Sequence, residues 1–168
     1  MKKLWCLVGI LAMGTVLFAE GGTPAGNAEK KATMDVKAEV IKPLTVKSNG
    51  DINFGGNIIK GTYVVGNSSF AIEGEKSSQI LISFDGAELG ENGNYKVKLN
   101  SEETPDVLLS YFNATANTDS ANNQYIDRNP IVTLGNDGKA NINIAASMTA
   151  NGAPGNYIGT FKLKALYQ

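Results

Sequence analysis

The side chains that most often carry out catalysis are scarce in this 168-residue chain. It has no histidine, its one cysteine is Cys6, and its one arginine is Arg128. Nucleophilic triads need an imidazole base beside a serine or cysteine, and the usual zinc sites draw on histidine and cysteine ligands. The sequence therefore excludes both kinds of site and leaves a single residue for bidentate anion binding.

Carboxylates are the remaining candidates for chemistry. Five acidic residues in the middle of the chain could supply a pair for glycoside hydrolysis or ligands for calcium: Glu73, Glu75, Asp85, Glu88 and Glu91. Their spacing does not match a calcium loop, and Asn136-Asp137-Gly138-Lys139 lies between two predicted strands, as a hairpin turn does. We interpret these residues as solvated strand ends and turns, and we expect no enzyme activity, no cofactor and no metal site.

The start of the chain has the pattern of a secretory signal peptide over residues 1–19. Lys2 and Lys3 precede an uncharged apolar run from Leu4 to Phe18, and Ala19 supplies the small residue at the expected cut. The pattern predicts export. Cys6 lies inside the signal, so the exported chain cannot form an intrachain disulfide. Without Lys2 and Lys3 the chain keeps 13 basic against 16 acidic residues, a balance that argues against nucleic acid as a partner.

The rest of the chain predicts an all-β fold. Residues 20–31 show no apolar periodicity and are expected to form a flexible leader, and residues 32–168 a single β-sandwich domain. Short alternating segments separated by turn-forming clusters are typical of a sandwich. Besides the first and last strands, these segments are Leu44–Val46, Ile52–Phe54, Tyr63–Val65, Ser69–Ile72, Gln79–Phe84, Tyr95–Leu99, Val107–Phe112, Ile131–Leu134 and Ala140–Ala145. The stretch Ala114–Asn129 is rich in Asn, Ala, Thr and Asp, and we expect it to be a long surface loop.

Strands with one apolar face are predicted at both ends of this domain. In the last strand the alternating residues on one face are Tyr157, Gly159, Phe161, Leu163, Ala165 and Tyr167. The first strand presents Met34, Val36, Ala38 and Val40, alternating with charged residues. Core strands at both ends either close a sandwich within one chain or allow one chain to lend a strand to its neighbour.

Four segments resemble the pilin-like subunits of chaperone-usher fimbriae of the archaic (Csu-like) type, and a related family of small exported bacterial domains. They are the first strand Met34–Val40, the short element Asp51–Gly55, the strand and turn Phe70–Glu75, and Pro154–Thr160 leading into the last strand. The resemblance implies an immunoglobulin-like sandwich that lacks its last strand. A periplasmic chaperone fills the gap first, and the first strand of the next subunit replaces it at an outer-membrane usher.

The resemblance also assigns roles to residues at both ends. Met34, Val36, Ala38 and Val40 would be the donor residues, Phe161–Tyr167 would lie beside the groove, and Tyr167 would take the penultimate-aromatic role in chaperone recognition. The protein would then be a structural or adhesive fimbrial subunit at the cell surface, with copies of itself, a chaperone and an usher as partners. The alternative is that Met34–Val40 is strand A of a self-contained sandwich, which would make the protein a monomeric surface or periplasmic binding module. Whether the first strand acts in cis or in trans stays open.

Overall fold

A computed structural model describes residues 32–119, 123–127 and 129–168. The chain divides into two compact units, Met1–Ala38 and Glu39–Gln168, and each is considered by itself. The predicted signal peptide and leader lie outside the described residues. In the part of the chain that is described, no helix is long and apolar enough to cross a membrane.

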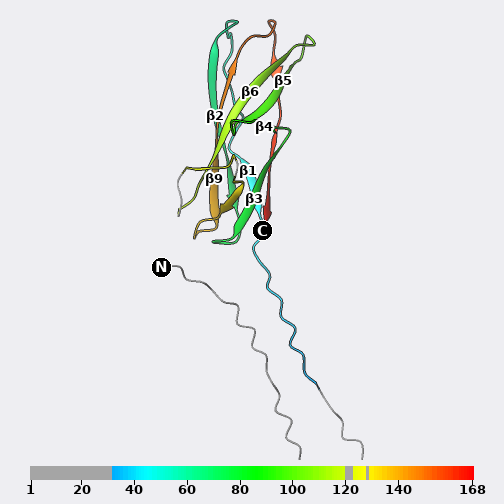
Figure 1. Cartoon of the computed structure of the whole chain (residues 1–168), viewed down its shortest axis with the longest axis vertical. Coiled ribbons are helices and arrows are strands. Elements are labelled where there is room, and N and C mark those ends of the chain that lie inside the picture. The colour runs from blue at the N-terminus through cyan, green and yellow to red at the C-terminus, as the bar shows by residue number, and fades with distance from the viewer. Residues whose placement is uncertain (1–31, 120–122, 128) are drawn as a thin grey trace, which may run out of the picture. The chain divides into compact units, whose positions relative to one another are not determined.

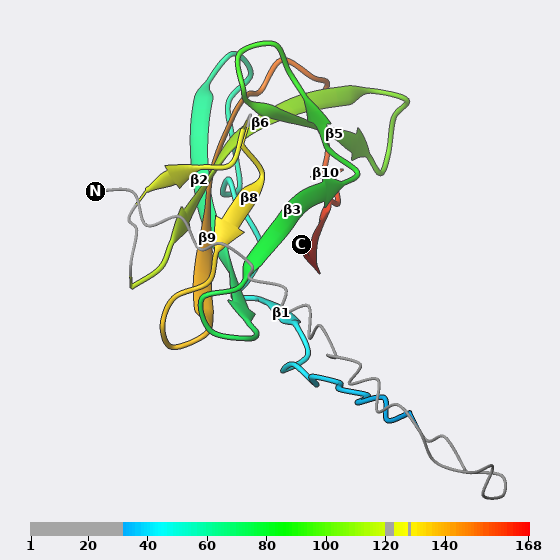
Figure 2. The same ribbon diagram turned by 60° about the horizontal axis from the view of Figure 1, so that its bottom comes forward.

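The second unit consists of two antiparallel sheets (Figures 1 and 2). The large sheet follows the order β1 (Thr45–Ser48), β2 (Tyr63–Glu73), β9 (Lys139–Thr149), β6 (Val107–Asn117), β5 (Tyr95–Ser101) and β10 (Tyr157–Ile158). Two short strands extend it, because β4 (Glu88–Leu89) pairs with β5 and β7 (Gln124–Tyr125) pairs with β6. The small sheet has the order β11 (Lys162–Tyr167), β3 (Gln79–Asp85) and β8 (Ile131–Thr133). The predicted all-β, immunoglobulin-like sandwich is thereby confirmed.

The core lies between the inner faces of the two sheets. Every second residue of β9 and β6 is buried, as expected for strands with one face in the core. An aromatic cluster joins the sheets: the ring of Phe84 on β3 lies 4.7 Å from that of Tyr95 on β5 and 5.3 Å from that of Phe112 on β6. Tyr95 is buried, but its hydroxyl donates to the Ile126 carbonyl oxygen at 3.1 Å, so the polar atom keeps a partner.

Two of the predicted segments are organised differently in the structure. The predicted strands Tyr63–Val65 and Ser69–Ile72 form one strand, β2, that continues through Gly66. The predicted strand Ile52–Phe54 is not a strand, because the segment packs across Gly66 instead of pairing. A β-carbon on Gly66 would lie only 2.9 Å from Ile52 Cγ2 and 3.1 Å from the Asn53 carbonyl oxygen, so only glycine allows this approach.

The prediction of a surface loop over Ala114–Asn129 is wrong at both ends of that stretch. Strand β6 extends to Asn117, with Ala114 and Ala116 buried on its inner face. Ile126 is fully buried, and its amide donates to the Ala114 carbonyl oxygen at 3.1 Å. Alanine fills the inner positions here, and its weak strand propensity conceals the alternation.

Both terminal strands also differ from expectation. Residues 32–44 are assigned no strand, and Met34, Val36 and Val40 expose 86%, 90% and 96% of their surface. The segment 157–167 is two strands in different sheets: β10 pairs with β5, whereas β11 pairs with β3. The chain changes sheets over residues 159–161. Period-two alternation reports which face of a strand is buried, but it does not report which sheet the strand joins. One continuous alternating pattern therefore spans both β10 and β11.

Candidate functional site

The strand order leaves one position of the immunoglobulin fold without a strand. In that fold strands A, B, E and D form one sheet and C, F and G the other. The order β1-β2-β9-β6 corresponds to A-B-E-D, and the pair β3-β11 corresponds to C-F. Among the described residues, β11 pairs only with β3, so the position of strand G beside β11 holds no strand. We call the space between the free edges of β1 and β11 the open seam.

The inner face of the sandwich is uncovered along this seam. Val46 on β1 pairs with the fully buried Ile72 on β2, so it lies on the inner face. Nevertheless 40% of Val46 is exposed, and Phe70 on β2 and Ala165 on β11 are only partly buried. The inward residues of β9, away from the seam, are all at most 7% exposed. The core is therefore closed over β9 and incomplete between β1 and β11.

Phe161 closes part of the core at the start of β11. Its ring stacks on Phe112 at a centroid distance of 4.6 Å and meets Phe84 and Phe70 edge-on at 6.0 Å and 6.1 Å. These three partners come from β6, β3 and β2, so the ring connects both sheets. It remains only partly buried, and a further apolar group beside it would remove more of its surface from water.

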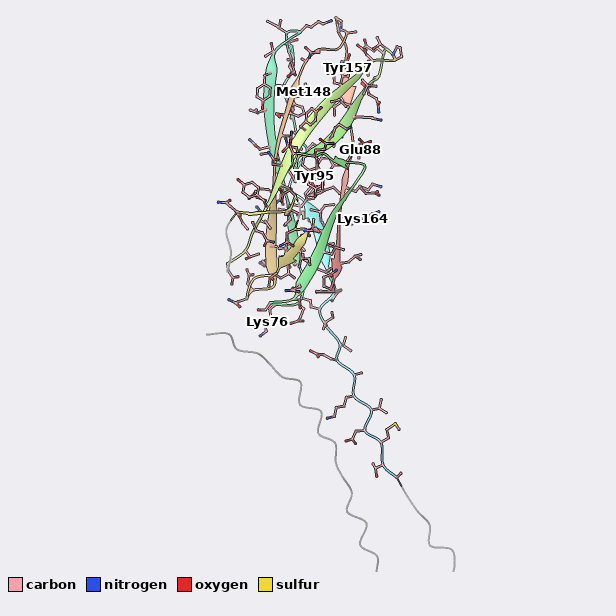
Figure 3. The ribbon with its side chains drawn as sticks, in the orientation of Figure 1. Lys76, Glu88, Tyr95, Met148, Tyr157 and Lys164 are labelled. Atoms are coloured by element: carbon pink, nitrogen blue, oxygen red, sulfur yellow. The ribbon has the colours of Figure 1, made fainter. Side chains whose placement is uncertain are left out.

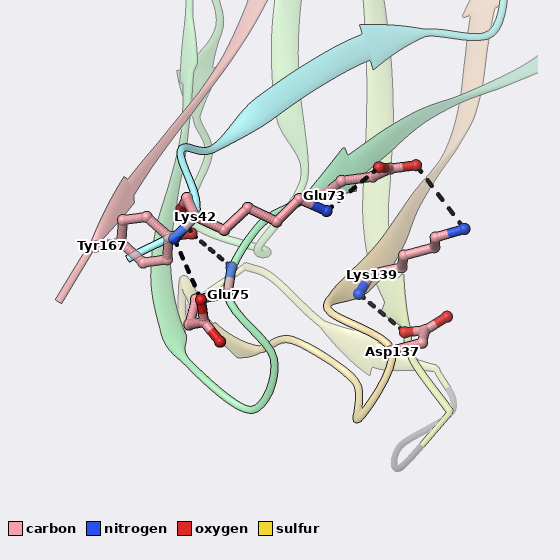
Figure 4. Close-up of polar contacts among 6 residues, drawn as sticks. All are labelled: Lys42, Glu73, Glu75, Asp137, Lys139 and Tyr167. Atoms are coloured by element: carbon pink, nitrogen blue, oxygen red, sulfur yellow. Dashed lines mark hydrogen bonds and ion pairs between the residues drawn. The ribbon is translucent and has the colours of Figure 1, made fainter. Parts of the chain in front are cut away.

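The end of β11 is tied to the segment that precedes β1 (Figure 4). The Tyr167 hydroxyl donates to the Lys42 carbonyl oxygen and accepts from the Glu75 amide, both at 2.6 Å. The Lys42 amide in turn donates to Glu75 Oε2 at 3.2 Å. We call these three residues the Tyr167 tie. A β-carbon on Gly74 would lie 2.5 Å from this hydroxyl, so glycine is needed there as well.

The Tyr167→Phe change is expected to lower the free energy of unfolding of a chain of residues 20–168 by about 1–2 kcal/mol. It removes two hydrogen bonds, each contributing on the order of 1 kcal/mol. Urea denaturation checks the value, with Tyr63→Phe as the control because Tyr63 is 65% exposed on the outer face of β2. Equal midpoints for Tyr167→Phe and the parent chain would show that the tie contributes nothing.

Three of the candidate carboxylates, Glu73, Asp85 and Glu88, form surface ion pairs. Glu73 lies 3.7 Å from Lys42 Nζ and 3.9 Å from Lys139 Nζ. Glu88 pairs with Lys96 at 2.7 Å and Asp85 with Lys164 at 2.9 Å. Glu88 and Lys164 are labelled in Figure 3. Hydrogen bonding and the charge of these lysines lower the pKa of both Asp85 and Glu88. Exposed pairs contribute little to stability, and no group of three or more potential metal ligands occurs in the described part of the chain.

A second hollow lies between residues 51–60 and residues 150–158. Its volume is about 590 Å³, and Ile52, Phe54, Leu108, Met148 and Tyr157 contribute to its lining. The Tyr157 hydroxyl donates to the Ala153 carbonyl oxygen at 2.8 Å and to Asp106 Oδ2 at 3.4 Å. Burial, followed by the charge of Asp106, raises the pKa of Tyr157. No residue of β1 or β11 lines this hollow, so it is separate from the open seam.

The residues predicted on the last strand lie in two places. Leu163 is buried, Phe161, Ala165 and Tyr167 are half-buried, and all four belong to the β11 side of the open seam. Tyr157 belongs to β10, and Gly159, which is exposed, lies in the crossing between the sheets. Sequence reasoning missed Leu44, Val46 and Phe70 as seam residues, although the alternation of Leu44 and Val46 carried the signal.

Comparison with known proteins gives only distant similarity, to solved structures. No family model and no curated protein matches the sequence. Among solved structures, the chain is similar to a chain of the CsuC–CsuE chaperone–tip adhesion subunit pre-assembly complex from the archaic chaperone-usher Csu pili of Acinetobacter baumannii. The identity is 14% and the TM-score 0.41, over 73% of this chain and 39% of that chain. This chain thus matches well under half the length of that chain.

Proposed function

We propose that this protein is an exported structural subunit that assembles into a cell-surface fibre by donating a strand to its neighbour. Met34, Val36, Ala38 and Val40 of one copy enter the open seam of the next and pair with the free edge of β11. The observation that carries the proposal is the uncovered inner face between β1 and β11. Strand addition of this kind gains affinity from main-chain hydrogen bonds and specificity from alternate side chains.

The free energy of such an insertion is large compared with that of the domain. Four apolar side chains at about 1.5–3 kcal/mol each give on the order of 6–12 kcal/mol before entropy is counted. The whole stability of a domain is about 5–15 kcal/mol. The inserted strand therefore decides whether the subunit folds stably, and it also covers a strand edge that would otherwise pair with other chains.

The proposal extends to the route of assembly. A subunit with an open seam aggregates unless another strand occupies the seam during export. A periplasmic chaperone would fill that role, an outer-membrane usher would exchange it for the next subunit, and other copies of this chain would be the lasting partners. The finished fibre would lie at the cell surface.

Removing the donor segment tests the proposal. A chain lacking residues 20–41 should aggregate or unfold at low temperature, and a peptide of residues 32–42 should restore a soluble, cooperatively unfolding monomer. The control peptide carries Val36→Asp and Ala38→Asp and should have no effect, because its two aspartates would have to be buried. A truncated chain that is stable, monomeric and indifferent to both peptides would refute strand donation and favour the self-contained module.

A further inference from the structure

The outer face of the large sheet has an unusual composition where β2, β9 and β6 lie side by side (Figure 1). Ser147 on β9 pairs with Val65 on β2 and with Tyr111 on β6, and in the next row Ala145 lies between Asn67 and Asn113. Two further rows centre on Asn143 and Asn141 of β9. None of the twelve residues in these four rows carries a charge, although 18% of the whole chain is charged. We call this surface the polar face.

Two ion pairs and two single lysines border the polar face. At one end Glu73 and Lys139 lie opposite each other across β2 and β9 and approach to 3.9 Å. At the β5 edge Lys96, next to Tyr111, is held by Glu88. The single lysines are Lys47 on β1, beside Ala71, and Lys98 on β5, beside Leu109, and neither forms an ion pair with a described residue. The twelve residues of the polar face themselves offer an acidic polymer no cation, and only Lys47 and Lys98 at its margins could attract one. The centre of the polar face therefore favours an uncharged partner.

The side chains of the polar face match the chemistry of a sugar. Asn67 and Asn113 are exposed on either side of the small Ala145, and each amide offers two donors and an acceptor. Tyr111 in the polar face and Tyr63, one row beyond it on β2, expose 42% and 65% of their surface and offer aromatic faces for C–H groups. Tyr63 and Tyr111 are separated by two strand spacings across the sheet and by two residues along the strands. Their rings are therefore on the order of 10 Å apart, which is comparable to the length of a disaccharide.

A second copy of this chain fits the polar face less well. Two flat sheets pressed together would remove water from rows of amides whose positions are fixed by their strands, and unmatched buried amides are costly. A sugar hydroxyl is donor and acceptor at once and can rotate to suit a fixed amide. We propose that the polar face binds a neutral polysaccharide chain. This function is separate from strand donation, because the polar face lies on the opposite side of the large sheet from the core.

Binding of the mature chain to immobilised polysaccharides tests the inference. The panel contains three neutral polymers, laminarin, dextran and galactomannan, and the acidic polymer alginate. We expect binding to at least one neutral polymer and not to alginate. Tyr111→Ala and Asn113→Asp should each weaken it by about tenfold, while Tyr111→Phe, which keeps the ring, should stay within about twofold of the parent. Thr133→Asp, which places the same charge at an exposed position of β8, should bind as the parent does.

Four results would overturn the inference. Three concern binding: absence of binding to all three neutral polymers, preference for alginate, and equal binding by the Asn113→Asp and Thr133→Asp chains. The fourth is a change in sedimentation caused by Asn113→Asp without any polysaccharide, which would assign the polar face to a second copy instead. The panel is repeated with a Val36→Asp chain, which cannot donate its strand under the proposed function. Binding by that chain separates the polar face from fibre assembly.

Discussion

Chains of residues 20–168 that carry Val36→Asp are expected to form no oligomers that resist heating in detergent, whereas the parent chain is expected to give a ladder of them. Under the proposed function, Val36 is central among the donor residues and enters the open seam beside β11. An aspartate there would have to be buried as an ion without a partner, which costs several kcal/mol. The four inserted side chains together contribute on the order of 6–12 kcal/mol of binding free energy. The cost of the buried aspartate removes a large part of that contribution.

The matched control for this experiment is Lys37→Asp. Lys37 is the next residue along the chain and falls on the other face of a strand in which Val36 points inward. The two variants place the same new carboxylate one residue apart on opposite faces, and Lys37→Asp makes the larger change in net charge because it also removes a lysine. Denaturing gels without prior boiling and analytical ultracentrifugation both report the outcome. Equal assembly by the two variants would contradict strand donation by this segment.

Phe161→Ala is expected to destabilise the subunit more when the donor peptide is bound than when the seam is open. In the open chain the ring is half-buried, and its loss costs less than the roughly 3–5 kcal/mol typical of a buried phenylalanine. With residues 32–42 bound beside β11, the ring becomes part of a closed core, and the cost rises into that range. Phe161 therefore reports on whether the seam is filled.

Thermal and urea unfolding of a chain without residues 20–41 are measured with and without the peptide. They give the free energies of unfolding of the filled and the open subunit, for the parent and for Phe161→Ala. Leu166→Ala is the control, because Leu166 lies on β11, which directly follows Phe161, also loses an apolar side chain, and is 64% exposed on the outer side. Its cost should be small in both states. A Phe161→Ala cost that is the same with and without the peptide would place the peptide elsewhere on the subunit.

The long alternating strands could be predicted from the sequence, because alternation reports directly which face is buried. Strands β3, β5 and β9 lie where the pattern placed them, give or take a few residues. The end of β6 was missed because Ala114 and Ala116 fill the core with small side chains that carry little strand signal. The apolar face of β11 was recognised in the sequence. Met34, Val36, Ala38 and Val40 alternate in the same way but form no strand in the structure, so their role as donors stays a prediction. The open seam between β1 and β11 was not visible in the sequence, because it depends on which strands pair.

The partners of single polar groups also lay beyond sequence reasoning. Tyr167 stood out as a penultimate aromatic residue, but its hydrogen bonds join residues that are 125 and 92 positions away. Sequence patterns report local periodicity, and they do not report which distant backbone groups a hydroxyl meets. The same holds for the four uncharged rows of the polar face, since their composition becomes visible only when the register of β2, β9 and β6 is known.

The Tyr167 tie has a mechanical consequence for a fibre built in the proposed way. Tension would enter each subunit at Lys42, just after its own donated segment, and would leave through the neighbour's strand lying along β11. Because Tyr167 joins Lys42 directly to the end of β11, the two loading points are connected by a short path at one edge of the sandwich. Pulling would then load the strand beside β11 along its length, in shear, while the aromatic core between the sheets carries little of the force.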